Sequence, residues 1–402
     1  MRKIWFVPIK KDFTIKSLFE IQKDPFNITM TVITVVLVSL FFYGVTDYLI
    51  HGHHAYNTTR QHPWGLLIAT YVFFVVSSTG LCIISSLGHV FKIKEFEIIG
   101  KRAILGAIIT ILSGFAVIAF EIGHPVTMLV YNVLTPNFTS AIWGMGTLYG
   151  AYLVFIMFEF LFLIRHDHKM ALIFGLGGLI IGIAAHSNLG AVFGFLIARP
   201  MSNGIFYPIY FILSAMITGS YLVFLIYTYK FKGYKEKFPK RVVAMFEKLE
   251  KILALLLFIL LFFEVWRMLT AIYGNMPGKA DTAWYVLKSK AFLIGEIFLG
   301  IVLPLIVILV NKGRAVKSLV FASMTGIVGI FFMRYDLVHD VQVYPMQLLK
   351  TSEYQLVPTF IEYSPSFTEI SISAGALGIC FAMYYVAEKV FDINYYDTHH
   401  DM

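Results

Sequence analysis

Ten long apolar stretches alternate with shorter polar connections along the 402-residue chain. Each has about the 20 largely apolar residues that a helix needs to cross a bilayer. The apolar residues run continuously instead of alternating with polar ones, which favours helices over membrane-spanning strands. The pattern therefore predicts an all-α integral membrane protein with ten transmembrane helices. The predicted helices cover Ile28–Ile50, Gly65–His89, Ala103–Gly123, Ser140–Ile164, Met170–Ile197, Ile205–Tyr229, Ile252–Ile272, Ala291–Asn311, Ala315–Tyr335 and Phe367–Val390.

The same pattern divides the chain into three parts. Residues 1–27 are basic and amphipathic and lack the apolar core and cleavage site of a signal peptide, so we expect a cytoplasmic amphipathic N-terminus. Residues 28–391 are expected to form one transmembrane domain, and residues 392–402 a cytoplasmic tail.

Lys and Arg fall mainly on one side of the predicted membrane, with 24 of the 32 in connections on that side and 6 on the other. Because cytoplasmic loops are enriched in Lys and Arg, both termini are predicted to be cytoplasmic. Connections on the cytoplasmic side are short, apart from Phe231–Leu249. Long loops on the outer side often carry function or bind a partner, so we expect the functional face there. The outer loops are His51–Trp64, His124–Thr139, Met276–Tyr285 and Leu337–Ser366.

Composition agrees with a membrane protein. Hydrophobic residues make up 58% of the chain and charged residues 14%, whereas soluble proteins average about 25% charged residues. The formal net charge of +8 is explained by Lys and Arg that set the topology. We therefore expect no binding to nucleic acid.

The positions of the cysteines and histidines predict that this chain binds no metal centre of its own. Cys82 and Cys380 lie in apolar runs without a CxxC motif, which predicts packing roles and no iron–sulfur cluster in this chain. We also expect no haem, because His89 and His186 lie at different depths in their helices. The remaining outer-loop histidines are expected to be solvated rather than metal ligands: His51, His53, His54 and His62.

Ionisable residues within the apolar stretches are the main functional signal. Arg334 and Asp336 end the ninth predicted helix, in the run FFMRYDLVHDVQVYP. Such a residue costs roughly 2.5–3.5 kcal/mol at a helix centre, so it is expected to face protein or a wet cavity. Glu159 lies nearer the cytoplasmic side. The other candidates share a level just below the outer surface, where we expect one cluster: Glu121, His124, His186, Asn188, Glu264, Arg267, Glu296, Tyr363 and Glu369.

Simpler roles remain open for several of these residues. Glu264 and Arg267 are three apart on one helix and can form a structural ion pair. His186 can make an ordinary hydrogen bond between helices. Glu121 and His124 can simply mark a helix end at the membrane interface.

Six motifs, in order along most of the chain, resemble the NrfD/polysulfide-reductase family of membrane subunits. The last two resemble the ten-helix branch of that family, which includes membrane subunits of certain hydrogenases, DsrP-type subunits and subunits of alternative complex III. The motifs are PWG (Pro63–Gly65), FEIGHP (Phe120–Pro125), MFEF (Met157–Phe160), AHSNLGAVFG (Ala185–Gly194), MRYDLV (Met333–Val338) and YSPSFTEISISAG (Tyr363–Gly375). Ser187-Asn188 departs from the His-Gln-Ser sequence common in the family.

The resemblance implies two four-helix bundles, at about residues 65–197 and 205–335, plus flanking helices. It also implies a quinone-reactive anchor without haem, with menaquinone or ubiquinone as the substrate. The implied partners are an extracytoplasmic ferredoxin-like iron–sulfur subunit and a catalytic subunit of the hydrogenase, molybdopterin or multihaem type.

Quinone chemistry moves two electrons and two protons, so it needs an apolar slot, hydrogen-bond partners for the ring oxygens, and titratable groups. We expect quinone contacts from His186, Asn188, Tyr363, Glu121 and His124. We expect proton transfer by Asp336, Glu296, Glu159 and Glu369. Arg334, Arg267 and Glu264 are the expected charge partners.

A proton- or ion-coupled transporter is the alternative, since it also buries charged residues between helices. Transporters usually break their helices near the membrane midplane, whereas the polar level here lies near one face. A purely structural anchor would have no need of Glu296, His186 and Arg334.

Overall fold

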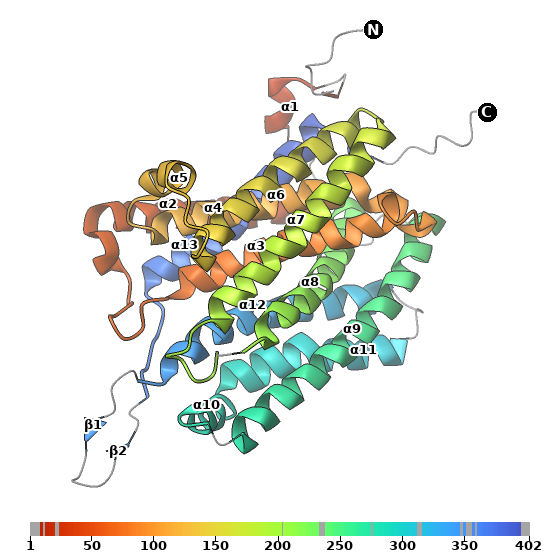
Figure 1. Cartoon of the computed structure of the whole chain (residues 1–402). Coiled ribbons are helices and arrows are strands. Elements are labelled where there is room, and N and C mark those ends of the chain that lie inside the picture. Colours follow the sequence, from red (N-terminus) through yellow and green to blue (C-terminus); the bar gives the residue numbers. More distant parts are fainter. Residues whose placement is uncertain are drawn as a thin grey trace.

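Ten long helices, mostly antiparallel to their neighbours in sequence, make up the computed structural model (Figure 1). The all-α, ten-helix prediction is confirmed. The structure describes residues 9–10, 13–20, 24–202, 204–232, 238–274, 276–311, 316–345, 349–350, 356–357 and 360–394. The long helices are α2 (Pro25–His51), α3 (Leu66–His89), α4 (Gly100–Glu121), α6 (Ala141–Ile164), α7 (His168–Gly194), α8 (Phe206–Lys230), α9 (Lys240–Tyr273), the π-helix η4 (Ala291–Val302) continued by α11 (Leu303–Asn311), α12 (Val316–Val343) and α13 (Phe367–Val390).

Short elements lie in the connections and at the N-terminus. Most of them lie in segments that we expected to be outer loops. The short elements are α1 (Ile15–Phe19), η1 (Gly52–Ala55), η2 (Lys94–Ile99), α5 (Pro125–Leu134), α10 (Lys279–Val286) and the antiparallel strands β1 (Leu349–Lys350) and β2 (Leu356–Val357).

Two predicted helix boundaries were wrong. Helix α9 begins at Lys240, directly after Pro239, so much of the expected inner loop is helical. Helix α12 continues to Val343 and carries Arg334 through Asp340 in its interior. Hydropathy marks the part of a helix that lies in lipid, whereas a helix continues until a breaking residue such as Pro345 stops it. Much of the rest of the predicted loop Leu337–Ser366 lies outside the described residues, as do residues 395–402 of the predicted tail and much of residues 1–27.

Helices α3, α4, α6 and α7, here called the first bundle, pack against one another, and α8, α9, η4–α11 and α12 form the second bundle. The two bundles meet where α3 crosses α8. A Cβ atom on Gly80 or Gly219 would collide with the backbone of the opposite helix at that crossing, so both positions need glycine. Helices α2 and α13 pack together beside α3 and α4.

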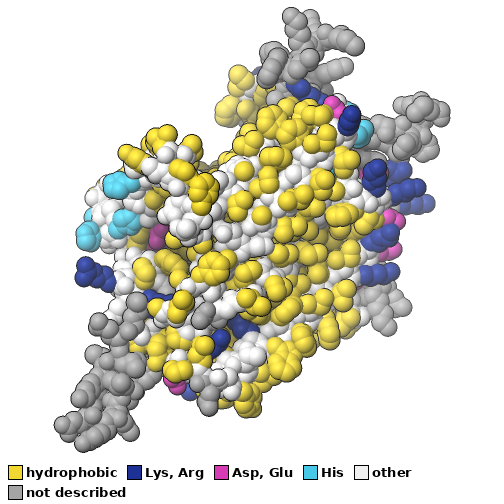
Figure 2. All heavy atoms as spheres, in the orientation of Figure 1, with side chains coloured by type: hydrophobic (Ala, Val, Ile, Leu, Met, Phe, Trp, Pro, Cys, Tyr) yellow, Lys and Arg dark blue, Asp and Glu magenta, His cyan; other side chains and the backbone are white. Residues whose placement is uncertain are grey.

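The molecule has two ends. Helix α1 and the end of α13 lie at one end, here called the terminal face, and the β1–β2 ladder lies at the opposite loop face (Figure 1). A broad apolar surface lies between them, and many Lys and Arg side chains gather towards the terminal face (Figure 2). The terminal face is the one that the distribution of basic residues predicts to be cytoplasmic.

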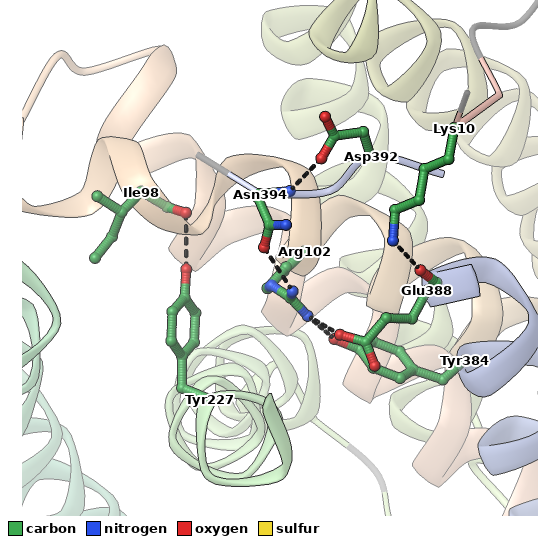
Figure 3. A network of polar contacts seen from close by, with 8 residues as sticks. All are labelled: Lys10, Ile98, Arg102, Tyr227, Tyr384, Glu388, Asp392 and Asn394. Atoms are coloured by element: carbon green, nitrogen blue, oxygen red, sulfur yellow. Dashed lines mark hydrogen bonds and ion pairs between the residues drawn. The ribbon is translucent and has the colours of Figure 1, made fainter. Parts of the chain in front are cut away.

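Polar contacts fasten the chain ends at the terminal face (Figure 3). The buried Arg102 donates to Tyr384 at 3.0 Å, to the Glu388 carboxylate at 2.8 Å and to the Asn394 side chain at 3.2 Å. Lys10 donates to the Glu388 carbonyl at 2.7 Å. These bonds hold the segments before α1 and after α13 against the start of α4.

Candidate functional site

The polar side chains that we expected in one cluster form three groups. One group lies at the loop end of the first bundle, one lies between the bundles, and one lies within the second bundle. The second and third groups lie close together, because the guanidinium carbon of Arg334 lies 5.8 Å from the centre of the Tyr210 ring.

The first group, here called the first-bundle site, contains Tyr56, Glu121, Tyr363 and Glu369. Glu369 is the third residue of α13 and closes a capping box with Ser366. One of its oxygens accepts from the Tyr363 hydroxyl and from the Leu66 amide at 3.2 Å, and the other accepts from the Asn57 amide at 3.1 Å. With this many bonds, Glu369 fastens the start of α3 to the start of α13.

Glu121 is the least satisfied member of the first-bundle site. It ends α4, and its Oε2 atom is buried without a hydrogen-bond partner among the described residues. Its carboxylate is close enough to interact electrostatically with both Glu369 and Tyr56. The Tyr56 hydroxyl donates to the Phe120 carbonyl at 3.1 Å. Burial, and next the charge of Glu121, raise the pKa of Tyr56, so this hydroxyl stays a neutral donor.

Aromatic rings pack together at the end of α4, around Phe120, the residue before Glu121. The Phe120 ring centroid lies 5.7 Å from that of Phe41 and 5.9 Å from that of Tyr48, which in turn stacks on Tyr56 at 5.5 Å. His124, three residues after Glu121 and directly before α5, is exposed. The site therefore combines an apolar aromatic wall, an unsatisfied carboxylate and neutral hydroxyl groups.

His62 is buried, although we expected it to be solvated. It is 1% exposed, and its Nε2 lies 3.0 Å from Nδ1 of His339 on α12. The His62 ring stacks on Tyr363 at 4.4 Å. Burial, and next the proximity of His339, lower the pKa of His62 to about 4. The hydropathy pattern had no signal for this pair, because the two histidines are 277 residues apart.

The second group lies between the bundles and centres on His186, which is fully buried. Its Nε2 lies 3.0 Å from the Phe211 carbonyl, which only accepts hydrogen bonds, so Nε2 carries the proton. Nδ1 then accepts from the Tyr149 hydroxyl at 3.0 Å. Both ring nitrogens are thus occupied, as the simpler structural role requires. A quinone oxygen would reach His186 only by displacing one of these partners.

Arg334 on α12 is linked through Ser214 to the Phe211 carbonyl that His186 contacts. It is fully buried and donates to the Ser214 hydroxyl, which itself donates to the Phe211 carbonyl at 2.9 Å. Its guanidinium carbon lies 4.8 Å from the centre of the Phe211 ring. Among the described residues no carboxylate lies within 4.0 Å of Arg334, so the expected ion pair is not formed. Asn188 lies elsewhere and donates to the Ala141 carbonyl at 2.7 Å.

The third group lies within the second bundle. Arg267 lies 2.9 Å from a Glu264 oxygen and 3.7 Å from a Glu296 oxygen, so the predicted Glu264–Arg267 ion pair is confirmed. Tyr210 donates to Glu296 at 3.1 Å. Glu296 lies in the π-helix η4, and π-helical turns are frequent at functional sites.

Two further acids complete the third group. Asp336 and Asp340 are buried on α12 and interact electrostatically with Glu296. Both Asp336 oxygens and one Asp340 oxygen lack a hydrogen-bond partner among the described residues. Among all the residues that the structure describes, no three His, Cys, Asp or Glu side chains are arranged to hold a metal ion.

A further pair, His89 and Glu159, lies outside the three groups and nearer the terminal face. Nε2 of His89 lies 2.5 Å from a carboxylate oxygen of Glu159, which is fully buried. Gly175 on α7 leaves room for the His89 ring, because a Cβ atom there would collide with it. On the loop-facing side, Tyr152 donates to the Ser78 carbonyl at 3.1 Å, which continues a line of polar groups towards Tyr149 and His186.

Comparison with known proteins relates this arrangement to a family of membrane subunits. The family model described as "Polysulphide reductase, NrfD" matches residues 54–346, from η1 to just past the end of α12. The chain is 25% identical over 415 residues to a subunit of the selenate reductase of Mesobacillus selenatarsenatis, covering 92% of this chain and 94% of the relative. It is also 25% identical over 381 residues to the Hdr-like menaquinol oxidoreductase integral membrane subunit of Archaeoglobus fulgidus, covering 90% and 92%.

Proposed function

The chain belongs to the polysulphide reductase NrfD family, and from this membership we propose that it is the quinone-reactive membrane anchor of a respiratory oxidoreductase. Two relatives are named as a subunit of a menaquinol oxidoreductase and of a selenate reductase, which supports a membrane subunit of a redox complex. In this proposal the catalytic metal centre belongs to another subunit. A ferredoxin-like iron–sulfur subunit on the loop face carries electrons between that centre and the quinone.

We place the quinone ring at the first-bundle site. The observation that carries this choice is Glu121, whose buried oxygen has no partner among the described residues. It lies at the loop end of α4, directly after Phe120, whose ring packs against Phe41 and Tyr48. A buried acceptor without a partner is costly and is satisfied when a hydroxyl group of a quinol binds there. The aromatic wall accommodates the ring, and His124 lies at the exposed margin.

The residues at and near the first-bundle site then have defined roles. Glu121 takes a proton from the bound quinol, or donates one to the quinone, because its carboxylate is the acceptor with a free oxygen. Tyr56 and Tyr363 keep their protons, since burial raises the pKa of both hydroxyls. Glu369 positions Tyr363. Asn188 holds the start of α6 rather than the ring, because its amide is bonded to Ala141.

Proton transfer across the bundle is assigned to the remaining buried groups. His89 and Glu159 stand nearest the terminal face, and Tyr152 with Ser78 connects their level to that of His186. Glu296 and Asp336 interact electrostatically within the second bundle. We propose that these groups exchange protons with the quinone site, with His186 as a positioning residue between the bundles.

A binding titration tests the site. The purified chain in nanodiscs is titrated with heptyl-hydroxyquinoline N-oxide, a fluorescent quinol analogue whose emission is lost on binding. Losing a hydrogen bond to a charged group costs about 1.5–3 kcal/mol, so Glu121→Gln should weaken binding by roughly tenfold or more. Asp47→Asn is the matched control, because Asp47 is a carboxylate at the loop end of α2 that already has a partner in Thr368. Equal affinity of wild type and Glu121→Gln would contradict the placement.

A further inference from the structure

A groove of about 250 Å³ lies at the loop end of the second bundle, between α8, α9 and the start of α10. It shares no residue with the first-bundle site, and it borders the third group through Arg267. The groove is lined by Met201, Phe206, Tyr207, Phe263, Trp266, Arg267, Thr270 and Lys279.

The walls of the groove are aromatic. The Phe206 and Phe263 ring centroids are 6.0 Å apart and lie in a T-shaped arrangement. Trp266 is 50% exposed, and the neighbouring apolar side chain of Phe262 on the same helix is 55% exposed. Since α9 is a membrane span, this exposed apolar side faces lipid, and an apolar ligand can enter the groove from the bilayer.

The base of the groove is polar and ionisable. Arg267 is 8% exposed, and its guanidinium is held by Glu264 at 2.9 Å and by Glu296 at 3.7 Å. A ligand oxygen in the groove therefore meets a fixed cationic donor backed by two buried acids. The Thr270 hydroxyl donates to the Trp266 carbonyl at 2.7 Å, so it can still accept a bond from a ligand.

The lining of the groove decides what kind of ligand fits. Two cations, Arg267 and Lys279, line it together with aromatic side chains, and no carboxylate of the described residues does; Arg267 is already paired with Glu264 and Glu296. A planar aromatic ring packs favourably against aromatic walls such as Phe206, Phe263 and Trp266, which a phospholipid headgroup does not need. A neutral ring with carbonyl or hydroxyl oxygens therefore meets an aromatic surface and cationic donors in the same groove.

We propose that this groove is a second quinone-binding site, independent of the first-bundle site, which takes the neutral ring from the lipid with one oxygen towards Arg267. The proposal rests on the proposed function only for the class of ligand. It makes the chain bind two quinone rings, one at the loop end of each bundle.

Trp266 is a built-in probe for the test, because quinones quench indole fluorescence on close contact. The chain in nanodiscs is titrated with a short-tailed menaquinone analogue, and the Trp266 signal is the difference between wild type and Trp266→Phe. Saturable quenching of this signal is expected. Thr270→Phe fills the groove and should weaken the quenching by about tenfold or more. The matched control is Thr46→Phe, because Thr46 on α2 is an exposed threonine with the same bond to the carbonyl four residues earlier.

Two further measurements separate the groove from the first-bundle site and locate the bound ring. Glu121→Gln should leave the Trp266 quenching unchanged, so a failure of the first-bundle site is distinguished from a failure of the groove. Crosslinking with an azidoquinone should label peptides of α8 or α9 in wild type and not in Thr270→Phe. Quenching that does not saturate, equal quenching in Thr270→Phe, or equal competition by a short-chain phospholipid would overturn the proposal, and the last result would make the groove a lipid site.

Discussion

Arg267 is the cation that compensates the buried acids of the second bundle, so replacing it is a direct test of the charge network. Arg267→Met keeps the length and apolar volume of the side chain but removes its charge. Glu264 and Glu296 are 2% and 0% exposed and would lose their ion-pair partner. We expect a large loss of stability.

The magnitude follows from the geometry. Coulomb's law with an effective dielectric constant of about 20 gives roughly 6 kcal/mol for the pair at 2.9 Å. Desolvation of the two charges cancels part of this attraction. Breaking a buried pair by removing one partner costs about 3–5 kcal/mol, because the remaining charge stays buried without compensation. The double variant Arg267→Met/Glu264→Gln should recover much of the loss, since it leaves fewer unpaired charges.

The free energy of unfolding is measured by titrating the purified protein in mixed micelles with SDS and following helicity. Lys279→Met is the matched control, because it removes a cation at the groove margin and should change stability by no more than about 0.5 kcal/mol. A loss below about 1 kcal/mol for Arg267→Met, or a double variant as unstable as the two single losses added together, would refute the assigned network.

Three other perturbations test separate contacts. Gly219→Leu should prevent stable folding, because the leucine side chain would collide with the backbone at Gly80. The expected readout is loss of the monodisperse peak in size-exclusion chromatography, and a normal peak would contradict the tight crossing of α3 and α8. Tyr149→Phe should lower the free energy of unfolding by about 0.6–1.7 kcal/mol, since it removes the donor to His186, and no change would mean that this bond is not formed. The lowered pKa of His62 means that the unfolded loop binds a proton more readily than the folded one between pH 6.5 and about 4, so the fastening of residues 57–65 should weaken as pH falls through this window. Hydrogen exchange of that loop should show the weakening in wild type and not in His62→Gln.

Much of the fold was predictable from hydropathy. The predicted span Phe367–Val390 coincides with α13, and Gly65–His89 differs from α3 by one residue. The family resemblance seen in the motifs was confirmed by the match of the family model. Helices α5 and α10 were missed because they are too short to span a bilayer, and a span-length criterion does not register them.

The candidate site was predictable only where its partners are close in sequence. Glu264 and Arg267 are three residues apart on one helix, so helical periodicity alone places them together. No such rule brings Glu296 to Arg267, and the fully bonded state of His186 depends on Tyr149 and on a backbone carbonyl of α8. Backbone groups are present at every residue, so a sequence pattern cannot identify which one a side chain meets.

The sequence by itself determined that the chain has ten helices long and apolar enough to cross a membrane, and it predicted that ionisable groups gather near one end of these helices. Both conclusions follow from the cost of polar groups in hydrocarbon, which depends on residue type and on position along a helix. Only the tertiary structure decided that these groups form three sites, that Glu121 has a free oxygen and His186 has no free ring nitrogen among the described residues, and that Arg267 borders a groove. These features depend on how helices rotate and cross, and the crossing of α3 and α8 at Gly80 and Gly219 is set by packing between residues far apart in the chain.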